Sequence, residues 1–568
     1  MDYGLPMTLT ARDPSLPGLG LGQFLPPEGV EYGEIFTRRW VVELILDLCG
    51  YCPDEDLTAQ FLVEPAVGNG AFLIAALDRL VAAKAKHAPD AEWSQLRTAI
   101  LAMDLQPEHV DTCRALIVRR LEQANCPAEI AEQLANDWLI AGNFLLTDLG
   151  DRQADVVVGN PPYIRIEDIA PPLLKAYRQA CPTMGGRADV YVGFYERGLE
   201  LLKPGGRLGY ICADRWMRNQ YGRGLRAKIV NGGFAMDACL LMHDAPAFEE
   251  EVSAYPAITV IRRGGQDSVA TGEATNKFDE SAAQRFASWA VAAETTPIES
   301  QALRASRLPH WHTNAASWPD GSPKTLAWLE ELADRLPLLE DESTGTRIGI
   351  GVATGADAVY VTKNTNAAEP ERMLPLAMPA DVKTGQYQWT GHYLVNPWAA
   401  DGLVELDEWP RLAAYLRQRS NAVQRRVVAR RNASRWYRTI DRVTTSLTDR
   451  PKLLLEDMKA RPNPVLEPGG HYPHHNLYYL VSDGWDLEVL GGLLLSDVIE
   501  RQITAYCVKM RGKTLRFQAQ YLRRVRAPHP HNLAHDVSRD LAQAFRDRDR
   551  AAATDAALRA FSIEAIPR

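Results

Sequence analysis

The chain has 568 residues, of which 46% are hydrophobic and 24% are charged. This composition is close to the average of globular proteins and excludes a mainly disordered chain, a collagen and a coiled-coil rod. There is no uninterrupted apolar run of about 20 residues, and no basic segment followed by an apolar stretch near the start, so we expect neither a membrane span nor a signal peptide.

The net charge of −9 hides an asymmetry along the chain. Residues 1–400 carry 35 basic and 52 acidic side chains, whereas residues 401–568 carry 28 basic and 20 acidic ones. A basic segment in an acidic chain favours a polyanion as the partner of that segment.

The eight cysteines are scattered through the chain. This usage is typical of the reducing cytoplasm, and we expect a cytoplasmic protein. Cys49 and Cys52 form an isolated CxxC pair. A structural zinc site needs a second pair, or two histidines at matching spacing, and none stands nearby. We therefore expect no metal site.

Residues 1–30 are rich in proline and glycine and predict an extended arm. Between residues 31 and 265, short apolar runs alternate with helical patterns, which predicts βαβ units, a mostly parallel sheet and an α/β fold. Ligands of such sheets bind beyond the carboxyl ends of the strands. After residue 265 the sequence becomes polar and mixed, so we expect a connecting region at 266–305 and a second domain at 306–568.

A glycine turn and an acidic turn follow the first two predicted strands. In EPAVGNGAFL, Glu64 ends a strand, and Gly68 and Gly70 form a tight loop before a helix. The loop lacks the third glycine of a dinucleotide fingerprint, and Glu64 suits a cationic amino group better than a pyrophosphate. Asp104 ends the next strand, where a carboxylate can accept hydrogen bonds from both hydroxyls of a ribose. Together these residues indicate S-adenosylmethionine.

The turn Asn160-Pro161-Pro162-Tyr163 follows the apolar run VVVG. Two prolines stiffen it, and Asn160 is held extended because a proline follows. The turn can present the Asn160 amide oxygen, the Pro161 carbonyl and the Tyr163 ring in fixed positions. Two acceptors and an aromatic face fit an amino group on a flat ring, and they would stabilise the charge that develops as its nitrogen attacks.

These motifs, in this order, resemble the class I S-adenosylmethionine-dependent DNA adenine-N6 methyltransferases, in particular the TaqI-type (gamma) branch of restriction–modification enzymes. The resemblance covers about residues 30–262 closely and 345–530 more loosely. It implies a doubly wound, mostly parallel catalytic domain at 31–265 and an α+β target-recognition domain at 306–568.

The resemblance also implies individual roles. The opening motif GEIFTRR places Phe36 and Thr37 beside the methionine part of the cofactor. The family usually has an acidic residue before an aromatic near the cofactor adenine, whereas this chain has Asn143 before Phe144; a carboxamide can still accept from the adenine amino group. The implied cofactor contacts are Phe36, Thr37, Glu64, Ala66, Gly68, Gly70, Asp104, Asn143, Phe144 and Asn160.

Arginine and lysine gather in two segments of the C-terminal part, residues 411–450 and KMRGKTLRFQAQYLRRVR. Such side chains neutralise phosphates; the alternative for 411–431 is a solvated charged helix. The motif around Phe248 resembles one that holds the extruded base, although Phe248 can equally belong to the core. The DNA-contact candidates are Arg165, Phe248, Arg425, Arg426, Arg430, Arg431, Arg435, Lys509, Arg511, Lys513 and Arg516.

Three histidines, His471, His474 and His475, also stand close together in this part of the chain. No cysteine or acidic residue nearby completes a ligand set, so we expect them to lie in a loop or to face DNA.

The resemblance predicts a site-specific methyltransferase that moves a methyl group from S-adenosylmethionine to N6 of a flipped-out adenine in duplex DNA. It would be the modification enzyme of a restriction–modification or phage-defence system, with any cognate endonuclease on a separate chain. The alternatives are an NPPY methyltransferase acting on RNA or on a protein glutamine, and a catalytically silent DNA-binding subunit. The glutamine enzymes are much shorter and lack a basic C-terminal domain. A silent subunit does not need Asn160 together with Glu64 and Asp104.

Overall fold

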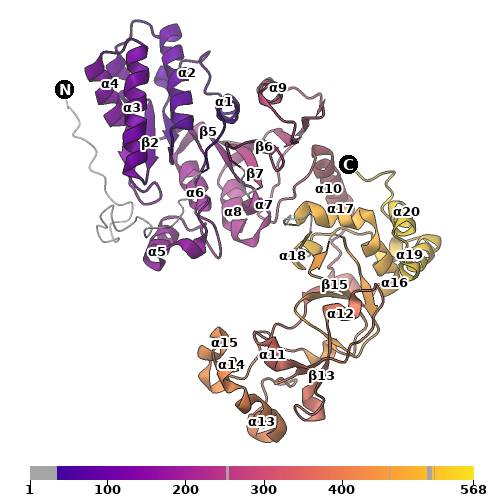
Figure 1. Cartoon of the computed structure of the whole chain (residues 1–568). Helices are drawn as coiled ribbons and strands as arrows, with labels where there is room; N and C mark the ends of the chain where they lie inside the picture. Colours follow the sequence, from indigo (N-terminus) through magenta and orange to yellow (C-terminus); the bar gives the residue numbers. More distant parts are fainter. Residues whose placement is uncertain (1–34, 251–254, 460, 508–514, 517–518, 568) are drawn as a thin grey trace. The chain divides into compact units, whose positions relative to one another are not determined.

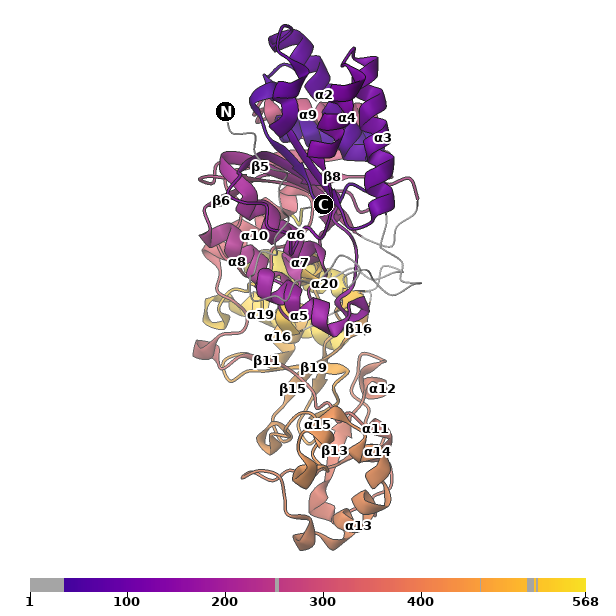
Figure 2. The same cartoon turned by 90° about the vertical axis from the view of Figure 1, so that its left-hand side faces the viewer.

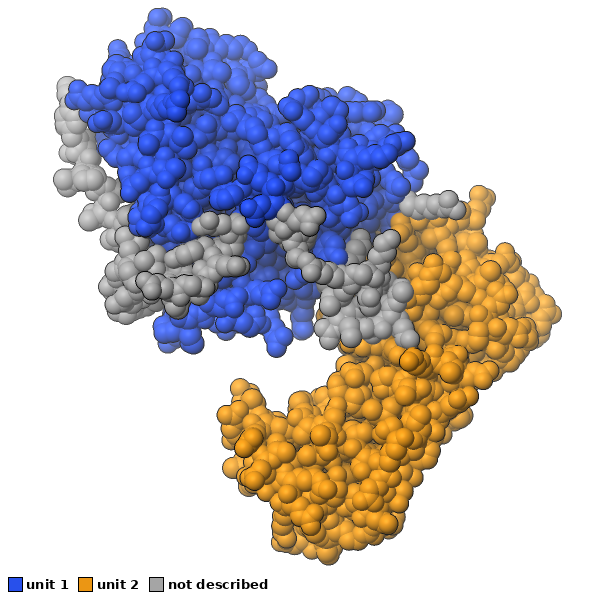
Figure 3. All heavy atoms as spheres, viewed as in Figure 1, with its two compact units in different colours: residues 1–327 blue, residues 328–568 orange. Residues whose placement is uncertain are grey.

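The computed structural model describes residues 35–250, 255–459, 461–507, 515–516 and 519–567 (Figure 1). The chain divides into two compact units, residues 1–327 and 328–568 (Figure 3). The boundary between them falls within helix α10 (Pro323–Arg335), later than the boundary predicted at residue 306. The arm predicted at 1–30 lies outside the described residues.

Unit 1 is built on a sheet of ten strands in the order β3-β2-β1-β4-β5-β7-β6-β8-β10-β9. The strands are β1 Leu62–Glu64, β2 Ile100–Asp104, β3 Leu139–Ala141, β4 Ala154–Gly159, β5 Leu202–Ala213, β6 Phe234–Leu241, β7 Pro256–Arg263, β8 Val269–Ala274, β9 Ile298–Glu299 and β10 Leu303–Leu308. The helices before α10 are α1 Arg39–Leu48, α2 Ala71–His87, α3 Pro107–Gln123, α4 Ala128–Trp138, α5 Pro171–Ala180, α6 Tyr191–Leu201, α7 Arg215–Arg218, α8 Arg223–Asn231 and α9 Glu280–Val291.

The first five strands pair in parallel, and β7 runs antiparallel between β5 and β6. The order reverses between β1 and β4, which are neighbours although β2 and β3 come between them in the chain. Ligands of open α/β sheets bind at such a switch point. The predicted mostly parallel, doubly wound α/β fold is confirmed.

Alternate residues of the central strands face opposite sides of the sheet, as the strand period requires. Leu62 and Ile100 belong to a core shared with α1, α2, α3, α4 and α9. Val63 and Leu101 belong to a second core, shared with α5, α6 and α8. Helices α2, α3 and α4 lie side by side in both views (Figure 1, Figure 2). Two separate cores therefore hold the sheet rigid beneath the loops at its edge.

The connecting region predicted at 266–305 is instead part of the sheet. Strand β8 pairs in parallel with β6, and β10 pairs antiparallel with β8. Helix α9 buries Phe286 and Trp289 in the same core as α1. The polar composition of this segment comes from its surface residues, and it led to the prediction of a connecting region.

Unit 2 is an α+β unit with two four-stranded sheets, β11-β19-β15-β17 and β12-β14-β13-β18, and a two-stranded sheet, β16-β20. The strands are β11 Arg347–Ile350, β12 Val361–Thr362, β13 Met373–Ala377, β14 Tyr393–Val395, β15 Lys452–Glu456, β16 Met458–Lys459, β17 Val465–Glu467, β18 Tyr472–Pro473, β19 Leu477–Val481 and β20 Leu515–Arg516. The helices are α11 Asp357–Tyr360, α12 Pro379–Val382, α13 Pro410–Gln418, α14 Ser420–Gln424, α15 Val427–Arg430, α16 Leu487–Leu495, α17 Asp497–Tyr506, α18 Ala519–Leu522, α19 His535–Asp547 and α20 Arg550–Phe561.

The first of these sheets and helices α16–α20 share one core, and the second sheet and α13 share another. None of the helices in the described ranges of either unit is long and apolar enough to cross a membrane.

Candidate active site

A pocket opens in unit 1 at the carboxyl ends of β1, β2 and β4, where the strand order reverses. Its empty volume is about 950 Å³, space open to solvent included. Nine of the ten residues predicted to contact the cofactor line it, namely Phe36, Thr37, Glu64, Ala66, Gly68, Asp104, Asn143, Phe144 and Asn160. The tenth, Gly70, is the N-cap of helix α2, between the lining residues Asn69 and Ala71.

Asp104 fixes the glycine loop through the backbone. Its Oδ2 accepts a hydrogen bond from the Gly68 amide at 2.9 Å, and its Oδ1 accepts one from the Gln106 amide at 2.9 Å. Gly70 adopts φ of 85°, which only glycine tolerates well, and this turns the chain into α2. Each carboxylate oxygen can accept a further hydrogen bond, so Asp104 shapes the loop and still offers acceptors to a ligand.

Glu64 brings an unsatisfied acceptor to the same pocket. Its side chain is only 1% exposed, and Oε2 has no hydrogen-bond partner among the described residues. Burial, with the nearby charge of Asp104, raises the pKa of Glu64 well above its usual value. A buried carboxyl oxygen without a donor is costly, and a cationic ligand group would satisfy it.

Asn160 is oriented by the segment that precedes α1. Its Nδ2 donates to the Ile35 carbonyl at 2.8 Å and lies 3.3 Å from Thr37 Oγ1. Because both contacts use the amide nitrogen, the amide oxygen must point the other way. That Oδ1 is buried and has no partner among the described residues. The side chain thus presents a fixed acceptor at the pocket wall.

The rest of the NPPY turn lies along the same wall. Pro161 is buried, Pro162 lines the pocket, and Arg165 is exposed just beyond. The hydroxyl of Tyr163 is buried near Cys212 of β5, and burial raises its pKa. The Tyr163 ring packs 6.4 Å from that of Tyr191, centroid to centroid. The hydroxyl end of Tyr163 is therefore buried, while the residue as a whole remains partly exposed.

Asn143 and Phe144 also line the pocket. Asn143 donates from Nδ2 to the Tyr177 hydroxyl at 2.9 Å and accepts from the Leu145 amide at 3.2 Å. Phe144 is buried against Phe194, with ring centroids 5.3 Å apart. The carboxamide that replaces the usual acid is thus braced by a tyrosine of α5.

Sequence reasoning missed several residues that line this pocket. His109 Nδ1 lies 3.4 Å from Asp104 Oδ1, and Tyr177, Val190 and Phe194 come from α5 and the start of α6. His109 stands five positions after Asp104, in the first turn of α3, and this short separation can be recognised in sequence. The other three carry no motif, because only folding brings their helices beside β3 and β4.

Phe248 does not fit the prediction that it contacts the extruded base. It is 7% exposed and lies in the core shared with α1. Its backbone pairs with Thr37, and its carbonyl accepts from Arg38 Nε at 2.8 Å. Through its backbone Phe248 therefore holds the segment that orients Asn160, while its ring packs in the core.

The candidate DNA-binding arginines of unit 2 fall into two kinds. Arg425, Arg430, Arg431 and Arg435 are exposed, and no carboxylate of the described residues lies within 4.0 Å of them. The prediction that Arg426 contacts DNA is wrong. Its guanidinium donates to the carbonyls of Thr354, Val423, Trp436 and Arg438 and to the Tyr360 hydroxyl. Its donors are committed to the fold rather than free for phosphate. Lys509, Arg511 and Lys513 lie outside the described residues, and Arg516 lies in β20.

Comparison with known proteins places these features among restriction–modification enzymes. Residues 98–232 match the family described as Eco57I restriction-modification methylase. The Type II methyltransferase M.PaeR7I of Pseudomonas aeruginosa is 42% identical over 94% of this chain and 92% of its own length. M.XhoI of Xanthomonas vasicola is 39% identical over 95% and 98%. The Type IIL restriction–modification enzyme MmeI, solved in complex with DNA, superimposes with a TM-score of 0.56 and 11% identity over 93% of this chain and 74% of its own, a likeness of fold.

The two kinds of arginine predict different effects on stability. Arg426→Ala removes donors from several partly buried carbonyls and should lower the free energy of unfolding by about 2 kcal/mol or more. Arg425→Ala removes an exposed side chain and should change it by less than about 0.5 kcal/mol. Urea denaturation of the two variants checks this, and equal midpoints would contradict the structural role of Arg426.

Proposed function

Because this chain belongs to the Type II methyltransferases of restriction–modification systems, we propose that it methylates the N6 amino group of adenine in duplex DNA, with S-adenosylmethionine as donor. The observation that carries the proposal is the Asn160 amide, whose nitrogen is anchored and whose oxygen is an unsatisfied acceptor. We assign any DNA cleavage to a separate cognate endonuclease.

The pocket residues fit S-adenosylmethionine. Glu64 Oε2 is a buried acceptor for the ammonium group of the methionine part, and Asp104 keeps acceptors for the ribose hydroxyls. Phe144 and the Asn143 amide provide an apolar wall and a polar edge for the adenine ring. When bound, S-adenosylmethionine supplies the methyl group as an activated sulfonium.

The NPPY turn receives the target base, which must leave the duplex to be reached. Asn160 Oδ1 accepts one N6 hydrogen and the Pro161 carbonyl accepts the other, while the Tyr163 ring stacks on the base. Two fixed acceptors favour the pyramidal nitrogen that attacks, and they stabilise the positive charge developing on it. Because the Ile35 and Thr37 contacts already orient Asn160, little reorganisation is needed when the base arrives.

Unit 2 offers the basic surface for DNA. The exposed Arg425, Arg430, Arg431 and Arg435 are free of ion pairs in the described structure, so their charge is available to phosphates. Arg426 serves this surface indirectly, by holding the segment that carries them.

The reaction is tested by expressing the chain in a methylation-deficient host and reading its DNA by single-molecule sequencing. We expect one sequence motif to carry N6-methyladenine near full occupancy. We expect Asn160→Ala to lose about 10²–10³-fold or more in turnover while its affinity for S-adenosylmethionine changes little, and the exposed Asn366→Ala to match wild type. A motif carrying N4-methylcytosine, or an active Asn160→Ala enzyme, would refute the proposal.

Replacing Glu64 should affect cofactor binding and protein stability in different ways. In Glu64→Gln the buried charge is gone, so the free enzyme should be at least as stable as wild type. The loss of a charge-assisted hydrogen bond should weaken S-adenosylmethionine binding about tenfold or more. Because the pKa of Glu64 is raised, lowering the pH protonates it and should weaken binding to wild type but not to the variant. Calorimetric titrations across a pH series check both effects; a wild-type affinity that is flat with pH would count against the ammonium contact.

The basic surface predicts a salt effect. Arg430→Gln combined with Arg431→Gln should weaken DNA binding and make the slope of log affinity against log salt shallower by about 0.9 for each phosphate that is no longer neutralised. The matched control, Arg539→Gln with Arg559→Gln, removes two arginines that bind Asp540. We expect it to leave the slope unchanged in fluorescence-anisotropy titrations; identical slopes for both double variants would exclude this surface.

A further inference from the structure

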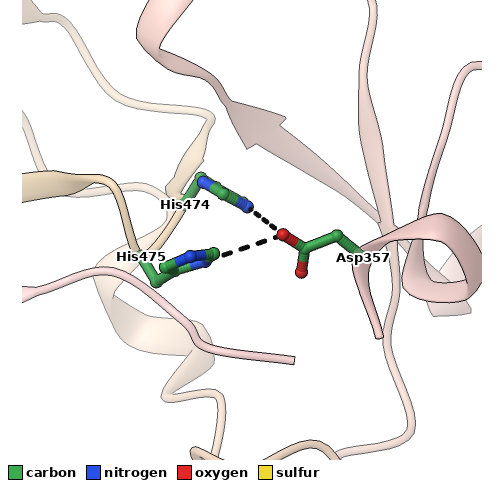
Figure 4. Close-up of side chains that lie close together, drawn as sticks. All are labelled: Asp357, His474 and His475. Atoms are coloured by element: carbon green, nitrogen blue, oxygen red, sulfur yellow. Dashed lines mark hydrogen bonds and ion pairs between the residues drawn. The ribbon is translucent and has the colours of Figure 1, made fainter. Parts of the chain in front are cut away.

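A carboxylate and two imidazoles converge in unit 2, and none of the three residues lines the pocket described above (Figure 4). Oδ2 of Asp357 lies 3.1 Å from His474 Nε2 and 3.8 Å from His475 Nδ1. All three atoms lie within 4.8 Å of one another. The sequence offered no acidic partner near the histidines, because Asp357 stands 117 positions before His474.

The fold brings these residues together through backbone pairing. Val352 forms a parallel bridge with His474, and its amide donates to the Pro473 carbonyl at 2.9 Å. Gly355, with φ of 73°, then turns the chain so that Asp357 begins α11. The two histidines follow directly on β18, which is itself paired with β13. The three side chains are therefore positioned by main-chain contacts and not by their own attraction alone.

The spacing suits a divalent transition-metal ion. Ligands of a tetrahedral zinc ion, about 2.0–2.1 Å from the metal, stand roughly 3.3 Å apart. The two histidine–carboxylate separations lie on either side of that value. Asp357 and His475 are partly exposed, at 43% and 34% of their side chains, so water can reach a fourth position.

The side chains also hold one another in place. His474 is 2% exposed. The Thr354 hydroxyl donates to Oδ1 of Asp357, which leaves Oδ2 facing the two histidines. Imidazole nitrogens and carboxylate oxygens are both common ligands of zinc.

Hydrogen bonding without an ion leaves one nitrogen unused. His474 can donate from Nε2 to Asp357, but Nδ1 of His475 is buried and has no hydrogen-bond partner among the described residues. A bound ion would use His474 Nε2, His475 Nδ1 and the carboxylate together.

A second cluster provides an instructive contrast. In unit 1, His243 Nε2 lies 2.6 Å from Asp214, and Asp320 is close by. There Arg218 pairs with both carboxylates, so the protein itself supplies the cation. Within the described residues, no lysine or arginine lies within 4.0 Å of the Asp357 carboxylate. Of these two clusters, the one in unit 2 therefore lacks its own counter-charge.

We propose that Asp357, His474 and His475 bind a divalent transition-metal ion, such as zinc, with water in the fourth position. The ion joins the start of α11 to the loop after β18. The loop before α11 also contacts the basic segment, because the Thr354 carbonyl accepts from Arg426. The ion therefore stabilises the part of unit 2 that carries the exposed arginines.

The test uses the untagged full chain, stripped with a chelator, and zinc added in competition with a chromogenic chelator. We expect one equivalent to bind to wild type and to raise the melting temperature, since a ligand specific for the folded state stabilises it. Asp357→Asn and His475→Gln are close in shape to the native residues and should each lose this equivalent and the shift.

His531→Ala is the matched control, because His531 lies beside His529 on the surface of unit 2, with ring centroids 5.1 Å apart. We expect it to bind zinc as wild type does. Absence of a stoichiometric site in wild type, undiminished binding in both cluster variants, or loss in His531→Ala would each overturn the proposal. Asn160→Ala should also bind zinc normally, so failure of the proposed methylation would not affect this result.

Discussion

The candidate active site depends on one feature of the backbone, the parallel pairing of β1 with β2 on one side and with β4 on the other. At that point the connections leave the sheet in opposite directions and open a crevice. Glu64, Asp104 and Asn160 end or follow these three strands, so they meet at one edge although they are far apart in sequence. Two hydrophobic cores, one on each face, keep the edge in place.

Two acceptors at that edge remain unsatisfied within the described structure, Oε2 of Glu64 and Oδ1 of Asn160. Buried polar atoms without partners reduce stability. The residues around these two atoms nevertheless hold them in defined positions. Asp104 uses its oxygens to hold the loop beside Glu64, and Ile35 fixes the far end of the Asn160 amide. Donors from water or from a ligand in the pocket relieve the destabilisation that these two atoms cause.

The basic segment of unit 2 shows that residue type alone does not reveal function. Arg425 and Arg426 are adjacent, yet one faces solvent and the other joins five backbone and hydroxyl groups. The loop that Arg426 holds leads directly into α11, whose first residue is Asp357. Local order in this loop, the exposed arginines and the proposed metal site are therefore parts of one arrangement.

The sequence by itself determined the family, the α/β sheet and most of the pocket. Membership of the restriction–modification methyltransferases, predicted from EPAVGNGAF, Asp104 and NPPY, is confirmed by the similarity to M.PaeR7I. These motifs can be recognised in the sequence because each lies within a few residues of a strand end, where the backbone must turn. Tertiary structure alone decided that Phe248 supports Thr37, that residues 269–308 extend the sheet, and that Asp357 meets His474. Those outcomes depend on pairing between distant segments, and no local pattern of side chains encodes which segments pair.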